Sequence, residues 1–133
     1  MGKLHITHIS SPSAVDLVVE AKKQGVDVSS SICPHHFIYD WDQMCGDDGI
    51  LWKMNPPLRE PDSKKRIFEY VRDKKIDWIE TDHAPHSLQE KIKEPYMSGI
   101  PGIAWWPFFE GFLQQQGFSA RQIEDLTFSN IVK

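Results

Sequence analysis

The sequence predicts an α/β fold in which parallel strands are covered by helices, and three observations lead to this prediction. Short apolar stretches alternate with amphipathic stretches along the chain. The amphipathic stretches are bounded by residues that cap or end helices. Polar residues that can bind a metal or take part in catalysis follow the apolar stretches directly. Alternation of this kind is typical of parallel sheets, whose functional residues gather at the carboxyl ends of the strands.

Four stretches have the pattern of short, partly buried strands. They are residues 3–9, 26–33, 50–55 and 76–82. The first alternates apolar and polar side chains, and the second and third are each ended by proline. Proline cannot donate to a sheet ladder, so it marks the end of a strand. We therefore expect four strands, each with polar residues at its carboxyl end.

Helices are predicted between and after these strands, over residues 11–25, 61–75, 105–116 and 120–128. Gly25 is expected to end the first helix, and Asp62 is expected to cap the second. Ser119 and Gln122 have the spacing of a capping box for the last one. Strands and helices together predict one domain, residues 1–133.

Composition and charge exclude several classes of protein. The net charge is −4 and the basic residues are scattered, which disfavours nucleic acid as a partner. No apolar run approaches the roughly 20 residues of a membrane span, and no signal peptide is evident. Cys33 and Cys45 do not form a disulfide framework, so a reducing, cytoplasmic setting is expected.

An aromatic cluster near the end of the chain leaves two interpretations open. It contains Trp105, Trp106, Phe108, Phe109 and Phe112. These side chains could form the buried face of a core helix. They could also form an exposed patch that binds a partner.

The segment TDHAPH (81–86) is the first candidate site. Its Asp82, His83 and His86 follow the apolar run 76–79. Titratable side chains are costly to bury without a partner, and a metal ion is a common partner of Asp and His together. A lone histidine at a strand end is more often structural, so the interpretation depends on other residues converging here.

Further candidate ligands follow the other predicted strands, namely His8, the pair His35–His36, and Asn55. Two imidazoles and a carboxylate suit zinc with one open position. Zinc lowers the pKa of a coordinated water to about 7, and a neighbouring aspartate can take up and return a proton. The pattern therefore indicates metal-assisted hydrolysis or the reverse condensation, with purely structural histidines as the alternative.

Two further segments could contact a small molecule. In NPPLR (55–59) the prolines stiffen the chain that carries Asn55 and Arg59, although a simple strand exit is an equal alternative. In SGIPG (98–102) the glycines allow the backbone to approach a ligand closely.

Five motifs, taken in order, resemble those of dihydroorotases in the amidohydrolase superfamily. They are HITHIS (5–10), CPHHF (33–37), NPPLR (55–59), TDHAPH (81–86) and SGIPG (98–102). The resemblance extends over roughly residues 4–133. It implies a TIM (β/α)8 barrel, of which this chain would form the C-terminal half, with strands about five to eight and their helices.

The resemblance also implies roles for individual residues. His8, His35 and Asp82 correspond to zinc ligands, for one or two ions, and Asp82 to the general acid/base. Asn55, His86, Pro101 and Gly102 correspond to residues that contact dihydroorotate. We interpret the remaining motif histidines, His5, His36 and His83, as supporting residues.

The chain also departs from the family pattern. An HxH metal pair, an arginine and a bridging carboxylate, all from the first half of the barrel, have no counterpart here. We therefore expect a homo-oligomer or a complementing chain to complete the site, and the isolated chain to be inactive. Ala104 and Trp105 stand where the family usually has an acidic residue and Thr or Ser, which leaves the shape of the substrate loop open.

Three functions follow from the resemblance. The first is zinc-dependent interconversion of N-carbamoyl-L-aspartate and L-dihydroorotate in pyrimidine biosynthesis. The second is a non-catalytic dihydroorotase-like scaffold for a partner such as aspartate transcarbamoylase. The third is the reaction of a related allantoinase or hydantoinase.

Overall fold

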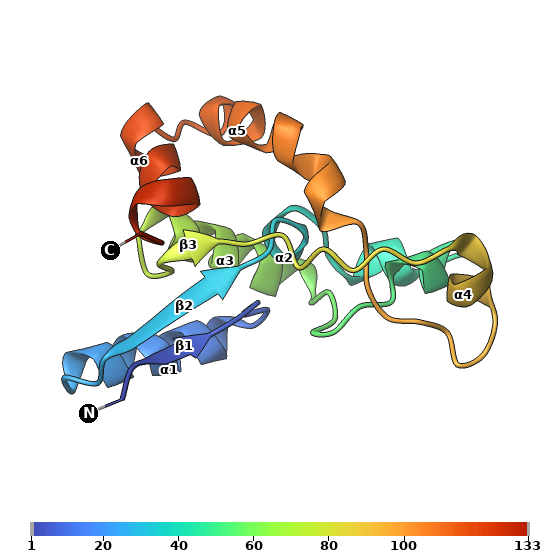
Figure 1. Cartoon of the computed structure of the whole chain (residues 1–133), viewed down its shortest axis with the longest axis horizontal. Helices are drawn as coiled ribbons and strands as arrows, with labels where there is room; N and C mark the ends of the chain where they lie inside the picture. The colour runs from blue at the N-terminus through green and yellow to red at the C-terminus, as the bar shows by residue number, and fades with distance from the viewer. Residues whose placement is uncertain (1, 133) are drawn as a thin grey trace.

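Three parallel strands form the centre of the chain (Figure 1). The computed structural model describes residues 2–132, so the two end residues of the predicted domain lie outside it. The strands are β1 (Leu4–Ile6), β2 (Val28–Ile32) and β3 (Trp78–Ile79), in that spatial order. Because both pairings are parallel, the three carboxyl ends lie at one edge of the sheet.

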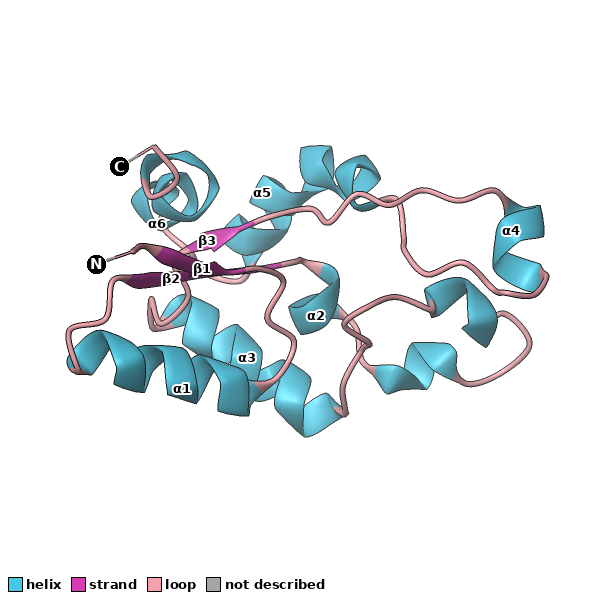
Figure 2. Cartoon of the chain, turned by 60° about the horizontal axis from the view of Figure 1, so that its bottom comes forward, coloured by secondary structure: helices cyan, strands magenta, loops and turns pink. Residues whose placement is uncertain are grey.

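Helices connect the strands and cover one face of the sheet, as the sequence predicted. Helix α1 (Pro12–Lys23) connects β1 to β2. The longer connection from β2 to β3 contains α2 (His35–Ile38), the 3-10 turns η1 (Trp41–Met44) and η2 (Gly49–Trp52), and α3 (Pro61–Arg72). Figure 2 shows α1 and α3 side by side beneath the strands. The mixed, parallel α/β architecture is therefore confirmed.

The main hydrophobic core lies between the sheet and these helices. The strands contribute Ile32 and Ile79, and the helices contribute buried residues at helical spacing, including Val15, Ile67 and Val71. Because apolar side chains face one way on each element, burial of this face stabilises the whole arrangement.

The helix ends agree with the sequence in most respects. Gly25 follows α1 with a φ of 81°, a conformation that suits glycine. Ser119 and Gln122 form the expected capping box of α6 (Ala120–Glu124). The expected cap of α3 was wrong, because Glu60 occupies the N-cap and Asp62 lies in the first turn.

The strand predicted over residues 50–55 is also wrong. Residues 49–52 form the turn η2, and β2 pairs directly with β3. The apolar side chains of this segment serve a second, smaller core, in which Met54 and Leu58 are buried against Ile100. The other predicted strands exist but are shorter than expected.

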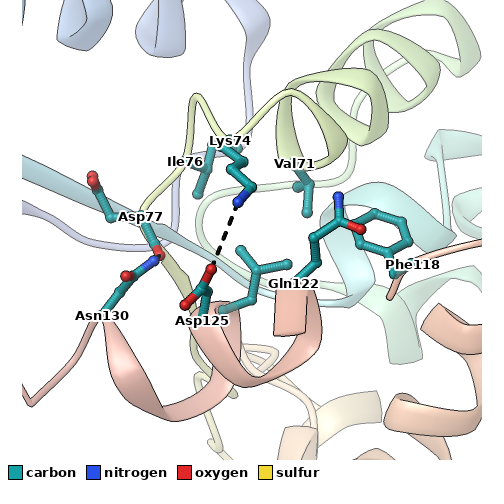
Figure 3. Close-up of a pocket in the computed structure, with 9 residues that line it drawn as sticks. Val71, Lys74, Ile76, Asp77, Phe118, Gln122, Asp125 and Asn130 are labelled. Atoms are coloured by element: carbon teal, nitrogen blue, oxygen red, sulfur yellow. Dashed lines mark hydrogen bonds and ion pairs between the residues drawn. The ribbon is translucent and has the colours of Figure 1, made fainter. Parts of the chain in front are cut away.

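The last helices pack at the β3 end of the sheet. They are α5 (Trp106–Gln115), α6, and one π-helical turn, η4 (Asp125–Ser129). A hollow of about 60 Å³ lies there. Figure 3 shows the residues that line it, among them Lys74 paired with Asp125, with 3.6 Å between Nζ and Oδ2. Asn130 donates a hydrogen bond to the Asp77 carbonyl at 2.8 Å. Because Asp77 precedes β3, this hollow lies at the amino end of that strand. The contacts of Asp125 and Asn130 there hold the last helices in place.

The aromatic cluster is divided between core and surface. Phe109 is buried, and Trp106 and Phe112 pack against the main core. Trp105 and Phe108 are exposed, by 41% and 74% respectively. Each of the two interpretations therefore holds for part of the cluster.

No membrane-spanning helix is found within residues 2–132. The longest helices, α1 and α3, have 12 residues each, which is well short of a bilayer's thickness.

Candidate metal and substrate site

The three predicted zinc ligands follow the three strands of the sheet. His8 lies just after β1, His35 begins α2 just after β2, and Asp82 follows β3. His8 and Asp82 have positive φ angles of 38° and 43°. Non-glycine residues rarely adopt this conformation, and where they do they often belong to functional sites.

Hydrogen bonds hold the end of β1 against its neighbours. The backbone N–H of His8 donates to the carboxylate of Glu80, which follows β3. The Arg59 side chain donates to the Ser10 hydroxyl at 3.0 Å. The backbone around His8 is therefore fixed from two other segments of the chain.

His35 and His36 are almost fully buried, with exposed fractions of 4% and 2%. Burial, together with the charges that His36 and His8 would carry, lowers the pKa of His35 to about 3. Burial also lowers the pKa of His36 to about 4, against the opposing effect of its hydrogen bond to the Pro56 carbonyl. Both imidazoles are therefore neutral near neutral pH, which is the form that binds metals.

A buried atom of His35 indicates that a metal fits here. Its Nε2 is buried and has no hydrogen-bond partner among the described residues. A buried polar atom left unpaired costs about 1–3 kcal/mol, so such atoms are rare. Imidazole nitrogen and carboxylate oxygen are among the donors that bind zinc in proteins. His8, His35 and Asp82 therefore have the chemistry of a zinc site.

The tightest group of donors differs from the predicted one. Donor atoms of Cys33, His35 and His36 lie within 4.8 Å of one another, and this group contains neither His8 nor Asp82. Sequence reasoning missed Cys33, which is fully buried. Its place just before the two histidines was the available signal.

Two of the predicted substrate residues lie together. A hollow of about 250 Å³ is lined by Leu51, His86, Leu88, Lys91, Gly99, Ile100 and Pro101. His86 donates from Nε2 to the Ser98 carbonyl at 3.1 Å, which fixes its ring against the loop. Asn55 is exposed and lies outside the set of lining residues, so the structure does not bring it to this hollow.

Gly102 serves the packing of the chain. A Cβ at this position would lie 1.9 Å from the Thr81 carbonyl oxygen. The glycine therefore allows the substrate loop to lie directly against the segment that carries Asp82. The close approach seen here is to the backbone of that segment. The approach to a ligand stays a prediction.

The histidines expected to be supporting residues have structural contacts. His5 hydrogen-bonds to Ser29 and Ser31 at 2.8 and 2.9 Å and stacks on Trp78. His83 accepts a hydrogen bond at Nδ1 from the Ile103 N–H at 3.1 Å. Both contacts tie neighbouring segments together, which agrees with a supporting role.

Comparisons with curated proteins identify relatives of this arrangement. The chain is 38% identical over 125 residues to a dihydroorotase of Listeria welshimeri. This match covers 91% of the chain and 29% of the Listeria protein. It is 36% identical over 133 residues to a dihydroorotase of Fusobacterium nucleatum, covering 97% and 31%. The chain is homologous to one segment of the dihydroorotases. No protein-family model matches it.

Solved structures of cyclic amidohydrolases share the fold. A D-hydantoinase from Bacillus sp. AR9 superposes with a TM-score of 0.87 at 23% identity, over 99% of this chain and 31% of that one. A dihydroorotase from Saccharomyces cerevisiae, solved with 5-fluoroorotic acid, gives 0.81 at 21% identity, over 98% and 37%. The chain spans about a third of the length of these dihydroorotase and hydantoinase relatives.

Proposed function

We propose that this chain forms part of the C-terminal half of a dihydroorotase barrel, to which it contributes the three strands β1, β2 and β3. In that barrel it contributes to the zinc-dependent interconversion of N-carbamoyl-L-aspartate and L-dihydroorotate in pyrimidine biosynthesis. The observation that carries the proposal is that His8, His35 and Asp82 follow three adjacent parallel strands in a chain homologous to dihydroorotases. The unpaired His35 Nε2 and the left-handed backbones of His8 and Asp82 support it.

The proposal gives each metal residue a distinct task. The imidazoles of His8 and His35 and the carboxylate of Asp82 hold zinc, which when bound supplies a Lewis acid for the ring amide and promotes ionisation of water. Asp82 also accepts a proton during attack on the ring amide. It then returns that proton to the ring nitrogen as the amide bond breaks.

The substrate residues orient dihydroorotate beside the metal ligands. His86 and Pro101 line a common hollow. Gly102 allows the loop that carries Pro101 to lie against Thr81. Asn55 lies outside this hollow and has no contact in this proposal. A ring held in one orientation reacts faster because its rotational freedom is already lost.

The proposal includes a complementing barrel segment, from another part of the protein, another chain or a second copy. The chain spans about 30% of its dihydroorotase relatives, and it supplies three of the metal ligands. The two cysteines are free, which agrees with the proposed cytosolic setting.

A chimera tests this function. The matched segment of the Listeria welshimeri dihydroorotase is replaced by this chain, and dihydroorotate hydrolysis is measured with zinc added. We expect activity in the chimera, and a loss of about 10²–10⁴-fold in kcat on Asp82→Asn, because the proton-transfer group is removed.

The matched control is Asp62→Asn, an exposed carboxylate in the first turn of α3. It should leave activity unchanged. A folded, zinc-loaded chimera that hydrolyses hydantoin or allantoin but not dihydroorotate would contradict the substrate assignment. One that hydrolyses none of them would contradict the catalytic role.

A further inference from the structure

Three soft or borderline metal donors meet at the corner between β2 and α2. They are the thiol of Cys33 and the imidazoles of His35 and His36, with donor atoms within 4.8 Å of one another. All three side chains are at least 96% buried. Thiol and imidazole together are the donor set that selects zinc and other thiophilic cations.

The hydrogen bond of His36 determines which of its nitrogens is free. Its Nε2 lies 3.0 Å from the Pro56 carbonyl oxygen. A carbonyl can only accept, so Nε2 carries the proton and Nδ1 of the neutral ring has a free lone pair. That Nδ1 is buried and has no hydrogen-bond partner in the described chain. Metal-binding histidines typically donate their second N–H to a carbonyl in this way.

His35 presents a second atom of the same kind. Its Nε2 is also buried and unpaired within residues 2–132. Two such atoms in adjacent residues are unusual, because each costs free energy that a bound cation would return.

The charge around the cluster also favours a cation. The carboxylates of Glu80 and Asp82 lie close enough to Cys33 to interact electrostatically with its side chain. Negative charge at this distance attracts a divalent cation into a low-dielectric site.

We propose that Cys33, His35 and His36 form a binding site for a thiophilic divalent cation, of which Zn²⁺ and Cd²⁺ are examples. The cation displaces the thiol proton of Cys33 to solvent, forms a bond to sulfur, and is bound by one nitrogen of each imidazole. Three protein donors leave a fourth position open.

This site goes beyond the proposed function and needs only the residues of this chain. His35 is common to both donor sets, whereas His8 and Asp82 belong only to the proposed hydrolytic set. A thiophilic cation held by Cys33 would therefore withdraw His35 from that set and inhibit hydrolysis.

Cadmium binding to the purified full chain tests the site. Cys45→Ser removes the exposed thiol and leaves Cys33 as the single cysteine. We expect one cadmium ion per chain, the ultraviolet thiolate-to-cadmium charge-transfer band, and release of protons on binding. Cys33→Ser should abolish the band, and His36→Phe should lower the affinity for cadmium at least about tenfold.

Each outcome decides the matter. A folded Cys45→Ser chain that shows no thiolate band at saturating cadmium would overturn the site, and this result does not depend on Cys33→Ser folding. A band of unchanged affinity in folded His36→Phe protein would also overturn it.

Asp82→Asn separates the two proposals, because it removes a donor of the hydrolytic set and leaves all three donors of the Cys33 site in place. We expect its band to remain whether or not dihydroorotate is hydrolysed. Loss of the band in folded Asp82→Asn protein would assign the cation to the hydrolytic set and reject the Cys33 site.

Discussion

Gly102 illustrates how a single residue fixes the relation between two functional segments. The TDHAPH and SGIPG segments lie side by side, with Ala84 N–H donating to the Ile100 carbonyl at 3.0 Å. The missing side chain of Gly102 allows this approach, because the Thr81 carbonyl occupies the space of a Cβ. A motif that suggested ligand contact in the sequence is therefore also a packing requirement.

Gly102→Ala is expected to destabilise the chain by about 1–3 kcal/mol, the usual cost of forcing an extra methyl group into a packed site. The obstacle is backbone at 1.9 Å, which cannot move aside as a flexible side chain would. Urea-induced unfolding measures the loss of stability.

Gly111→Ala is the matched control, since a Cβ there would meet no atom within 4 Å. It lies inside α5, so alanine should stabilise by about 0.5–1 kcal/mol. Equal effects of the two substitutions would contradict the packing role of Gly102.

At the scale of a secondary-structure element, helix α4 (Leu88–Ile92) connects two loops through one buried side chain. Figure 1 shows it on a long arm away from the strands. Lys91, which is 5% exposed, donates from Nζ to the carbonyls of Lys53 and Gly99, each at 2.8 Å. The Gly99 N–H donates to the same Lys53 carbonyl at 3.0 Å. Lys91 therefore joins the segment before NPPLR to the substrate loop.

Lys91→Met should keep the buried hydrocarbon part of the side chain and remove its hydrogen bonds to the carbonyls of Lys53 and Gly99. Two carbonyls then lose a charged donor, so we expect a loss of about 1–3 kcal/mol in unfolding free energy. Hydrogen exchange at Ala84 and Gly99 should accelerate, because the loop that protects these amides is loosened.

Lys93→Met, on an exposed residue just after α4, is the control and should leave exchange unchanged. Unaltered protection of Ala84 and Gly99 in Lys91→Met would show that the loop is held by other contacts.

At the scale of the elements, sequence patterns predicted what depends on local periodicity. The helices α1 and α3 could be predicted because their apolar residues repeat over more than one helical turn, and the neighbouring strands because they are short apolar runs. The segment 50–55 has an equally apolar pattern, but it packs with Ile100, which is 45 or more residues later in the chain. Local patterns carry no information about which of two cores will receive a segment.

The candidate site shows the same division. The positions of His8, His35 and Asp82 after strands could be predicted, because parallel strands bring their carboxyl ends together. The Cys33 cluster had one signal, the cysteine before two histidines, but the free nitrogen of His36 depends on a hydrogen bond to Pro56, twenty residues away. The exposure of Asn55 likewise depends on the loss of the predicted strand before it.

At the scale of the whole molecule, the two cores come together just before η1, where Ile38 packs against the main core and Tyr39 against the smaller one. The Asp40 carboxylate is only 8% exposed and pairs with Lys64 of α3. It also accepts a hydrogen bond from the Asp42 N–H at 3.0 Å. Trp41 N–H donates to the Arg59 carbonyl at 2.9 Å beside it. This junction connects the helix-covered sheet to the arm that carries the substrate loop.

The Asp40–Lys64 pair should make the stability of the molecule depend on pH. The hydrogen bond from Lys64 holds the pKa of Asp40 below its ordinary value. A carboxyl whose pKa is lower in the folded than in the unfolded state contributes stability above the unfolded value, about 3.9, and loses it as the pH falls through the folded value. Asp40→Asn should therefore lower the unfolding free energy by about 1–3 kcal/mol at neutral pH.

Urea unfolding across the acid range should show this difference from wild type shrinking as the wild-type carboxyl becomes protonated. Asp47→Asn, an exposed carboxylate, should show no such difference. A difference for Asp40→Asn that stays constant with pH would mean that the amide disturbs packing rather than removing a charge.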